Sequence, residues 1–179
     1  MPQINVPKRD EVSPANQAIF DTLKGKLGFV PNLYATLAHS EHALGTYLAL
    51  QNSKSSISGK SREVVNLVVS QVNDCAYCLA AHTAIAGMVG FKPEQILEIR
   101  TGRAPWDSKL DTLARLSKDI VVKRGHADPA LVDAFLAAGW TKEQLVDAIV
   151  AIGDKVVTNF LHGTTRVPVD FPEAPPLAA

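Results

Sequence analysis

Both cysteines of the chain lie in one short stretch, Cys75-Ala76-Tyr77-Cys78, and His82 follows four residues after the second. The thiolate, rather than the thiol, is the nucleophile and the metal ligand, so a base beside a thiol indicates reactivity. Two cysteines three residues apart do not make the disulfide framework of a small secreted protein, and in a reducing compartment such a pair is more often catalytic or metal-binding. The stretch predicts a redox site.

Glycines, prolines and capping residues divide the rest of the chain into apolar segments of helical length, which predicts an all-α protein built as a multi-helix bundle. Ser40, Ser58 and Asp74 are the expected N-caps of the third, fourth and fifth helices. The valine-rich fourth segment would suit a strand by propensity, but its length and lack of alternation favour a buried helix. The expected helices span about 14–27, 31–38, 40–51, 59–73, 75–89, 93–101, 107–125, 128–139 and 141–161.

The chain length of 179 residues fits one domain, which we expect over residues 1–166. Residues 167–179 carry four prolines and are expected to form an extended tail along a neighbouring surface. Residues 90–96 and 139–145 resemble each other, and each follows an apolar helix, which indicates a duplicated helical unit. Only the first copy has cysteines.

The charges of the chain balance, with 18 basic and 18 acidic side chains. No broad field exists to steer the protein to nucleic acid or to an anionic membrane, so a protein partner or a small substrate is expected. The N-terminus has no apolar leader segment, and no apolar run reaches the roughly 18 residues of a membrane span. We expect a cytoplasmic protein.

Helical geometry relates Glu63 to the thiols. If residues 73–74 form the turn between two antiparallel helices, Glu63 lies ten residues before it and His82 eight after it. At the helical rise per residue their heights differ by only about 3 Å, so the two side chains can face each other. Cys78 and His82 are i, i+4 neighbours on one helical face. Glu63 lies about 8 Å in height from Cys78, so a proton between them needs a relay through His82 or a water.

The two thiols have different expected roles. Cys75 gains from the helix N-terminus and Cys78 from the imidazole, and both effects lower the pKa of a thiol. The base four residues away favours Cys78 as the attacking thiolate. The turn position favours Cys75 as the exposed partner that resolves the intermediate and meets an external reductant.

The spacing of Glu63, Cys75, Cys78 and His82 resembles the signature of the alkylhydroperoxidase D-like branch of the carboxymuconolactone decarboxylase superfamily. Residues 63–70 and the region of residues 159–160 are similar to its peroxidase-related members. The resemblance implies an alkylhydroperoxidase D-like all-helical fold, homo-oligomers such as trimers or hexamers, and reduction of hydroperoxides by thiols with neither a cofactor nor a metal. The family pattern has a histidine just before the second cysteine, where this chain has Tyr77; the tyrosine leaves the proposed relay intact.

In the cycle that the resemblance implies, a thiolate attacks the peroxide, a sulfenic acid forms and condenses with the second cysteine, and a dithiol or protein-disulfide reductant restores the thiols. Our hypothesis is therefore a cytoplasmic antioxidant peroxidase. Cys78 attacks, Cys75 resolves through an intramolecular disulfide, His82 acts as the base and Glu63 orients it.

Four other interpretations remain open. The cysteines could be inert core residues beside a core histidine, or Cys75, Cys78, His82 and Glu63 could bind zinc. The protein could also be a non-catalytic helical oligomer that senses oxidation through its cysteine pair. A decarboxylase like others in the superfamily is the fourth, although the Cys-x-x-Cys pair argues against that reaction.

Overall fold

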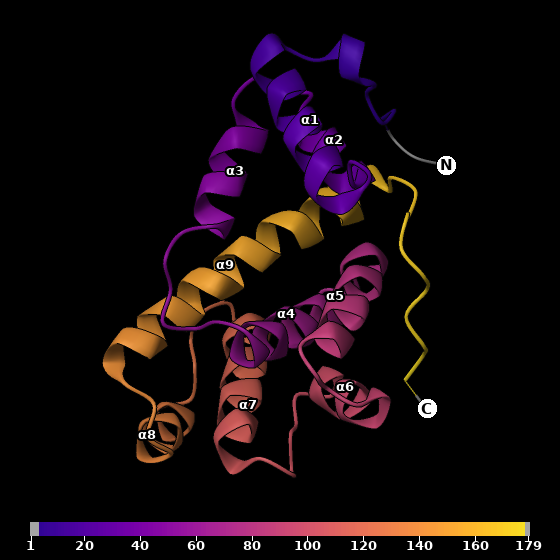
Figure 1. Ribbon diagram of the computed structural model, residues 1–179. Coiled ribbons are helices and arrows are strands. Elements are labelled where there is room, and N and C mark those ends of the chain that lie inside the picture. The colour runs from indigo at the N-terminus through magenta and orange to yellow at the C-terminus, as the bar shows by residue number, and fades with distance from the viewer. Residues whose placement is uncertain (1–3, 178–179) are drawn as a thin grey trace.

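The computed structural model describes residues 4–177, and within them the chain forms nine α-helices, one 3₁₀ helix and no strand (Figure 1). The predicted all-α class is confirmed. The ends of the predicted domain and tail, residues 1–3 and 178–179, lie outside the described residues. The elements are η1 Arg9–Glu11, α1 Pro14–Leu27, α2 Asn32–Leu37, α3 Ala43–Gln51, α4 Lys60–Val72, α5 Ala76–Met88, α6 Pro93–Arg100, α7 Ser108–Val122, α8 Pro129–Ala137 and α9 Lys142–Thr165.

Local sequence signals explain where several helices begin and end. The Ser13 side chain caps α1 by accepting from the Asn16 N–H, and Gly28 ends that helix with a φ of 83°. Thr141 and Gln144 form the reciprocal capping box expected at the start of α9. These short-range hydrogen bonds need no tertiary information.

The caps expected at Ser40 and Ser58 are wrong. Helix α3 begins at Ala43 with His42 as its N-cap, although Ser40 Oγ still accepts a hydrogen bond from the Ala43 N–H at 3.2 Å. Helix α4 has Gly59 rather than Ser58 at its N-cap. Gly59 has φ 54° and ψ −128°, a conformation open to glycine because it lacks Cβ, so the backbone turn sets the start of α4.

Helix α4 is the centre of the fold, and α5, α6, α7 and α9 all pack against it (Figure 1). Every residue from Glu63 to Ser70 is buried. A helix enclosed in this way lacks the polar face of a surface helix, which explains why its buried apolar residues Val64, Val65, Leu67, Val68 and Val69 lie on several sides of the helix. The main apolar core joins α4 to α7, α8 and α9 and includes Leu67, Leu113 and Phe135.

The first three helices form a smaller unit around Phe20, Leu44 and Tyr47, and both α2 and α3 lie against α9. A third apolar cluster contains the two cysteines and Val167. After α9 the chain is extended and descends beside α5 and α6, as the yellow segment of Figure 1 shows. The tail therefore covers part of the surface around the cysteines.

Helix α9 continues to Thr165, beyond the expected end near residue 161, and passes through Gly163. Gly163 does not end the helix as expected. The helix ends at Arg166, which takes the left-handed conformation with φ 52°. No described helix is long and apolar enough to cross a membrane.

The two similar segments fold alike where they resemble each other. Gly90 and Gly139 have φ values of 88° and 85°. Each is followed by a buried aromatic residue, Phe91 or Trp140, and then by a new helix. The same glycine and aromatic turn is thus used twice, before α6 and before α9.

Candidate functional site: a thiol pair beside a buried carboxylate and histidine

The hairpin of α4 and α5 brings Glu63 and His82 together, as the sequence predicts. Glu63 Oε2 lies 2.8 Å from His82 Nδ1, and Asn66 Nδ2 donates to Glu63 Oε1 at 2.8 Å. All three side chains are buried. Two helices of ordinary rise, joined by a short turn, are enough to produce this contact.

The charges around the pair favour a carboxylate and a neutral imidazole. Burial raises the pKa of Glu63, but His82, Asn66 and Lys155 together outweigh it and lower that pKa overall. Burial and the Lys155 ammonium lower the pKa of His82 against the attraction of Glu63. The Nδ1–H of the neutral ring therefore donates to Glu63, which leaves the Nε2 lone pair free to accept a proton.

The turn between the two helices positions Cys75, not Asp74, as the N-cap of α5. Cys75 Sγ accepts a hydrogen bond from the Cys78 N–H at 3.3 Å. The expectation that Asp74 caps this helix is wrong, because Asp74 has φ 49° and ends α4 instead. At the C-terminal end of α4, the Cys75 N–H donates a hydrogen bond to the Ser70 carbonyl at 3.0 Å.

Both thiols are free and buried, with Cys75 1% and Cys78 2% exposed. The expectation that Cys75 is the exposed cysteine is therefore wrong. Leu33, Tyr77 and Val167 pack around the pair. The turn position does not expose Cys75, because the tail after α9 closes over it.

The pKa values of the two thiols shift in opposite directions. The hydrogen bond between the sulfurs raises the pKa of Cys75, and burial adds to that rise. The same bond lowers the pKa of Cys78 to about 7 against the effect of burial, with help from Lys155, Asn159 and Thr158. The expected lowering of the pKa of Cys75 by the helix N-terminus is wrong, since Cys75 keeps its proton to donate to Cys78. The electrostatics favour Cys78 as the thiolate.

The buried face of α9 supplies polar groups that sequence reasoning missed as site residues. Lys155, which is 3% exposed, lowers the pKa of Cys78 and of His82. Asn159 accepts from Asn73 Nδ2 at 2.9 Å and donates to Ser70 Oγ at 3.3 Å. In the sequence, only residues 159–160 were connected with the site, through their similarity to the peroxidase-related proteins. The helical spacing of these polar residues in the otherwise apolar middle of the helix could have identified the face. Its members are Asp154, Lys155, Thr158 and Asn159.

No hydrogen bond joins Cys78 to His82 in the described part of the chain. The two residues share one face of α5, but the groups that act on the Cys78 thiol are Cys75 and the side chains of α9. The direct transfer of the thiol proton to His82 therefore does not follow from a contact in this structure. It needs a water or a rotation of a side chain.

His82 instead borders a cavity of about 360 Å³. Arg62 from α4 and Asp154 from α9 form an ion pair in its wall. Asn66 Oδ1 and Asp154 Oδ1 are buried here and have no hydrogen-bond partner among the described residues. The remaining wall is mostly serine and amide side chains of residues 51–59. The polar lining therefore suits a small polar molecule.

Comparison with known families bears on the segment that contains this site. Residues 38–114 match the model of the carboxymuconolactone decarboxylase family. The segment includes Glu63, both cysteines and His82, so the resemblance expected from the sequence is confirmed. No curated protein matches the chain.

Solved structures of similar fold cover nearly the whole chain. A peroxidase-related protein of Silicibacter sp. TM1040 has a TM-score of 0.82 at 23% identity, over 93% of this chain and 91% of that one. A peroxidase-related protein of Ralstonia eutropha JMP134, described as an alkylhydroperoxidase AhpD core, has a TM-score of 0.84 at 20% identity, over 94% and 92%. The debrominase Bmp8 bound to 2,3,4-tribromopyrrole has a TM-score of 0.76 at 12% identity, over 95% and 94%. The predicted alkylhydroperoxidase D-like fold is confirmed.

Tyr77 stands where the alkylhydroperoxidase D pattern has histidine, and here it holds the C-terminal tail. Its hydroxyl donates to Asp170 Oδ1 at 2.5 Å, and Asp170 Oδ2 accepts from the Asn32 N–H at 2.7 Å. The rings of Tyr77 and Phe171 meet edge to face with centroids 5.6 Å apart. These contacts fix the tail where Val167 is buried beside the cysteines.

Metal binding by the four predicted site residues is the remaining alternative that the geometry addresses. Over residues 4–177, no three side chains of His, Cys, Asp or Glu are close enough together to hold a metal ion. A zinc site made of Cys75, Cys78, His82 and Glu63 therefore gains no support from their arrangement.

Proposed function

We propose that the protein is a cytoplasmic thiol-dependent hydroperoxide reductase that cycles through a Cys75–Cys78 disulfide. The observation that carries the proposal is the pair of adjacent reduced thiols at the start of α5, where the Cys78 N–H donates to Cys75 Sγ at 3.3 Å. Cys78 has a pKa lowered to about 7, whereas the pKa of Cys75 is raised. One cysteine is thus ready to attack at neutral pH while the other stays protonated.

In the first step the Cys78 thiolate attacks the terminal oxygen of a hydroperoxide. A sulfur–oxygen bond forms and the oxygen–oxygen bond breaks. The hydroperoxide proton stays on the sulfenic acid, and the alkoxide takes one proton from solvent and leaves as the alcohol. The cavity beside His82 is polar and large enough for a small hydroperoxide, but neither cysteine lines it, so the peroxide meets the buried Cys78 only after a side chain between them moves. Neutral His82, held by Glu63 through Nδ1, keeps Nε2 free to exchange protons with the peroxide and the alcohol.

In the second step Cys75 resolves the sulfenic acid on Cys78. The negative charge on Cys78 and its hydrogen bond hold the proton on Cys75. Oxidation of Cys78 removes that charge, so the pKa of Cys75 falls at the moment when its thiolate is needed. The Cys75 sulfur attacks, a disulfide forms and water leaves. A dithiol or protein-disulfide reductant then supplies two electrons and two protons to restore both thiols.

The test is consumption of cumene hydroperoxide with dithiothreitol as the donor. We expect Cys78→Ser to lose at least about 1,000-fold in rate, because serine does not ionise at neutral pH. Cys75→Ser is the matched variant: without dithiothreitol it should consume one equivalent and keep a sulfenic acid on Cys78 that dimedone traps, whereas the wild type should form the disulfide. Turnover that survives Cys78→Ser would exclude this mechanism.

The same variants separate the other hypotheses. A redox sensor would form the disulfide with peroxide but complete no catalytic cycle with the donor. A decarboxylase activity of the family type would persist in a double serine variant and disappear in His82→Ala.

A further inference from the structure

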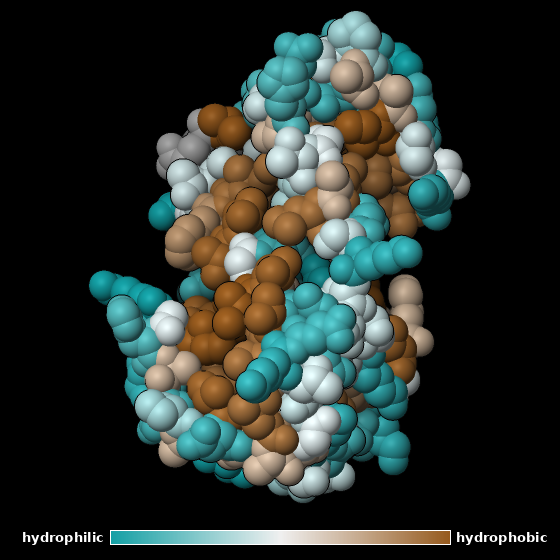
Figure 2. All heavy atoms as spheres, turned by 90° about the vertical axis from the view of Figure 1, so that its left-hand side faces the viewer, coloured by the Kyte–Doolittle hydropathy of each residue, from teal (hydrophilic) through white to brown (hydrophobic). Residues whose placement is uncertain are grey.

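The outer face of α9 carries no charge along most of its length. Its five large apolar side chains are 43% to 62% exposed. An exposed helix face is ordinarily polar, and 20% of the residues in this chain are charged. Figure 2 shows apolar side chains gathered in a brown band down the side of the molecule where α9 begins. The exposed residues from 146 to 165 are Val146, Ile149, Val150, Gly153, Val157, Phe160, Gly163 and Thr164.

Gly153 and Gly163 lie on this face, and no contact within the protomer requires glycine at either position. A Cβ added at either position would meet nothing within 4 Å, and both residues are helical. Glycine weakens the interior of a helix, so an alanine would be the better residue if the face met only water. A glycine surface does allow a second backbone to approach closely.

We propose that the outer face of α9 binds the same face of a second copy of this chain, antiparallel, about a two-fold axis at Gly153. The pattern of exposed residues is symmetric about that position. In such a pair, Val146 lies opposite Phe160 of the second copy, and Ile149 lies opposite Val157. A two-fold interface requires this kind of self-complementary surface.

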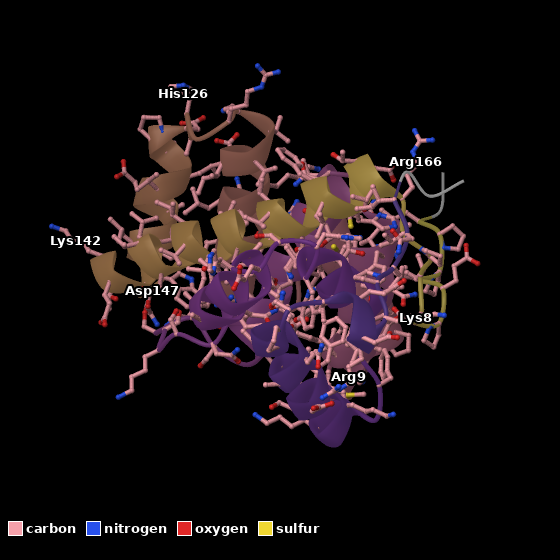
Figure 3. The ribbon with its side chains drawn as sticks, turned by 90° about the horizontal axis from the view of Figure 1, so that it is seen from above. Lys8, Arg9, His126, Lys142, Asp147 and Arg166 are labelled. Carbon is pink, nitrogen blue, oxygen red and sulfur yellow. The ribbon has the colours of Figure 1, made fainter. Side chains whose placement is uncertain are left out.

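Charges at the two ends of the face favour the antiparallel arrangement. Glu143 in the first turn and Arg166 at the C-cap are both exposed, and neither forms an ion pair in the described structure. Lys142 and Arg166 mark the opposite ends of α9 in Figure 3. An antiparallel copy brings its Arg166 to within about 4.5 Å in height of Glu143, which long side chains can span. A parallel copy would place like charges together.

The exposed apolar area of the outer face of α9 is compatible with a dimer interface. Five half-exposed apolar side chains amount to on the order of 400 Å² for each copy. Two copies and the polar edges of the face approach the roughly 1,000 Å² that specific interfaces exceed. The chemistry of the thiols lies on the opposite face of α9, so this inference does not rest on the proposed function.

Light scattering and sedimentation over a series of protein concentrations test the pairing. We expect a dimer, or a larger assembly made of such dimers, and half that mass for Phe160→Asp. Gly153→Leu should also halve the mass while keeping its melting temperature as a dilute monomer, since the added side chain meets nothing in the protomer. Val122→Asp on α7 is the matched control, because Val122 is 58% exposed, and it should keep the wild-type mass.

Charge reversal tests the orientation. Glu143→Arg alone and Arg166→Glu alone should each weaken the pairing by roughly tenfold, and the two together in one chain should restore it. A wild-type protein that stays monomeric at all concentrations would overturn the proposal. So would an assembly that Phe160→Asp leaves intact, or a double reversal that restores nothing.

Discussion

The two faces of α9 are opposite in character to those of an ordinary surface helix. The inner face holds Asp154, Lys155, Thr158 and Asn159, all buried. The outer face exposes valines, an isoleucine and a phenylalanine to the surface. Burying polar groups costs free energy unless each finds a partner, and exposing apolar ones gains nothing from water. Such an inversion indicates that both faces serve a purpose other than the stability of the protomer.

The inner face is the electrostatic environment of the thiols. Lys155 and Asn159 come from a helix about 80 residues after Cys78, yet both lower the pKa of that thiol. The outer face touches none of these groups. Substitutions on the inner face should therefore change the chemistry of Cys78, whereas substitutions on the outer face should change only association.

The largest expected effect follows from removing the Asp154 carboxylate. Asp154 is 1% exposed and pairs with Arg62 in the wall of the cavity. Asp154→Ala leaves the arginine without its partner and should lower the free energy of unfolding by about 3 kcal/mol. Urea denaturation measures this loss. Asp133→Ala on α8 removes an exposed carboxylate and should change stability by less than about 0.5 kcal/mol.

The next effect is on the pH dependence of the thiolate. Alkylation of Cys78 by iodoacetamide should speed up as pH rises through about 7, because the thiol ionises there. Lys155→Met removes the nearby ammonium and should raise the pKa of Cys78 by about one unit. The variant should react about tenfold more slowly near pH 6 and equally fast at high pH.

Fragment mass spectrometry assigns that alkylation to Cys78 rather than Cys75. Lys142→Met provides the matched control, since Lys142 is an exposed residue at the far end of the same helix, and it should leave the midpoint in place. An unchanged midpoint in Lys155→Met would mean that α9 does not set the reactivity of the thiol.

The sequence predicts the parts of this site that depend on regular geometry. Helical rise and one short turn place Glu63 against His82, and the 2.8 Å contact agrees. The caps at Ser13 and Thr141 are likewise local. The fold class follows from the same signals, because nearly every helix boundary has its own capping residue, glycine or proline.

Most of the failed expectations depend on contacts with distant segments or on unusual backbone angles, and one depends on a local side-chain hydrogen bond. Cys75 is buried because Val167 and the tail reach it from the other end of the chain. Its pKa is raised by a hydrogen bond to Cys78 that the spacing alone did not indicate. Asp74 is not a cap because its backbone is left-handed. Composition and periodicity carry little information on such contacts.

A smaller effect concerns access to the thiols through the tail. Tyr77→Phe removes the hydrogen bond to Asp170 and should weaken the attachment of the tail by about 1 kcal/mol. Both cysteines should then react several-fold faster with an uncharged alkylating reagent at fixed pH. Asp170→Ala should act in the same way, and the double variant should add little to either one. Full additivity would indicate that the two residues do not hold the tail together.

Substitutions on the outer face of α9 should have the smallest effect on the chemistry of the thiols. Ile149→Thr replaces a half-exposed apolar side chain with a polar one and leaves every inner contact in place. In dilute protein the free energy of unfolding should stay within about 0.5 kcal/mol of wild type. The pH midpoint of Cys78 alkylation should also stay where it is, because no charge near the thiol has changed. A shifted midpoint would mean that the two faces of α9 are coupled, and association through the outer face would then tune the thiol.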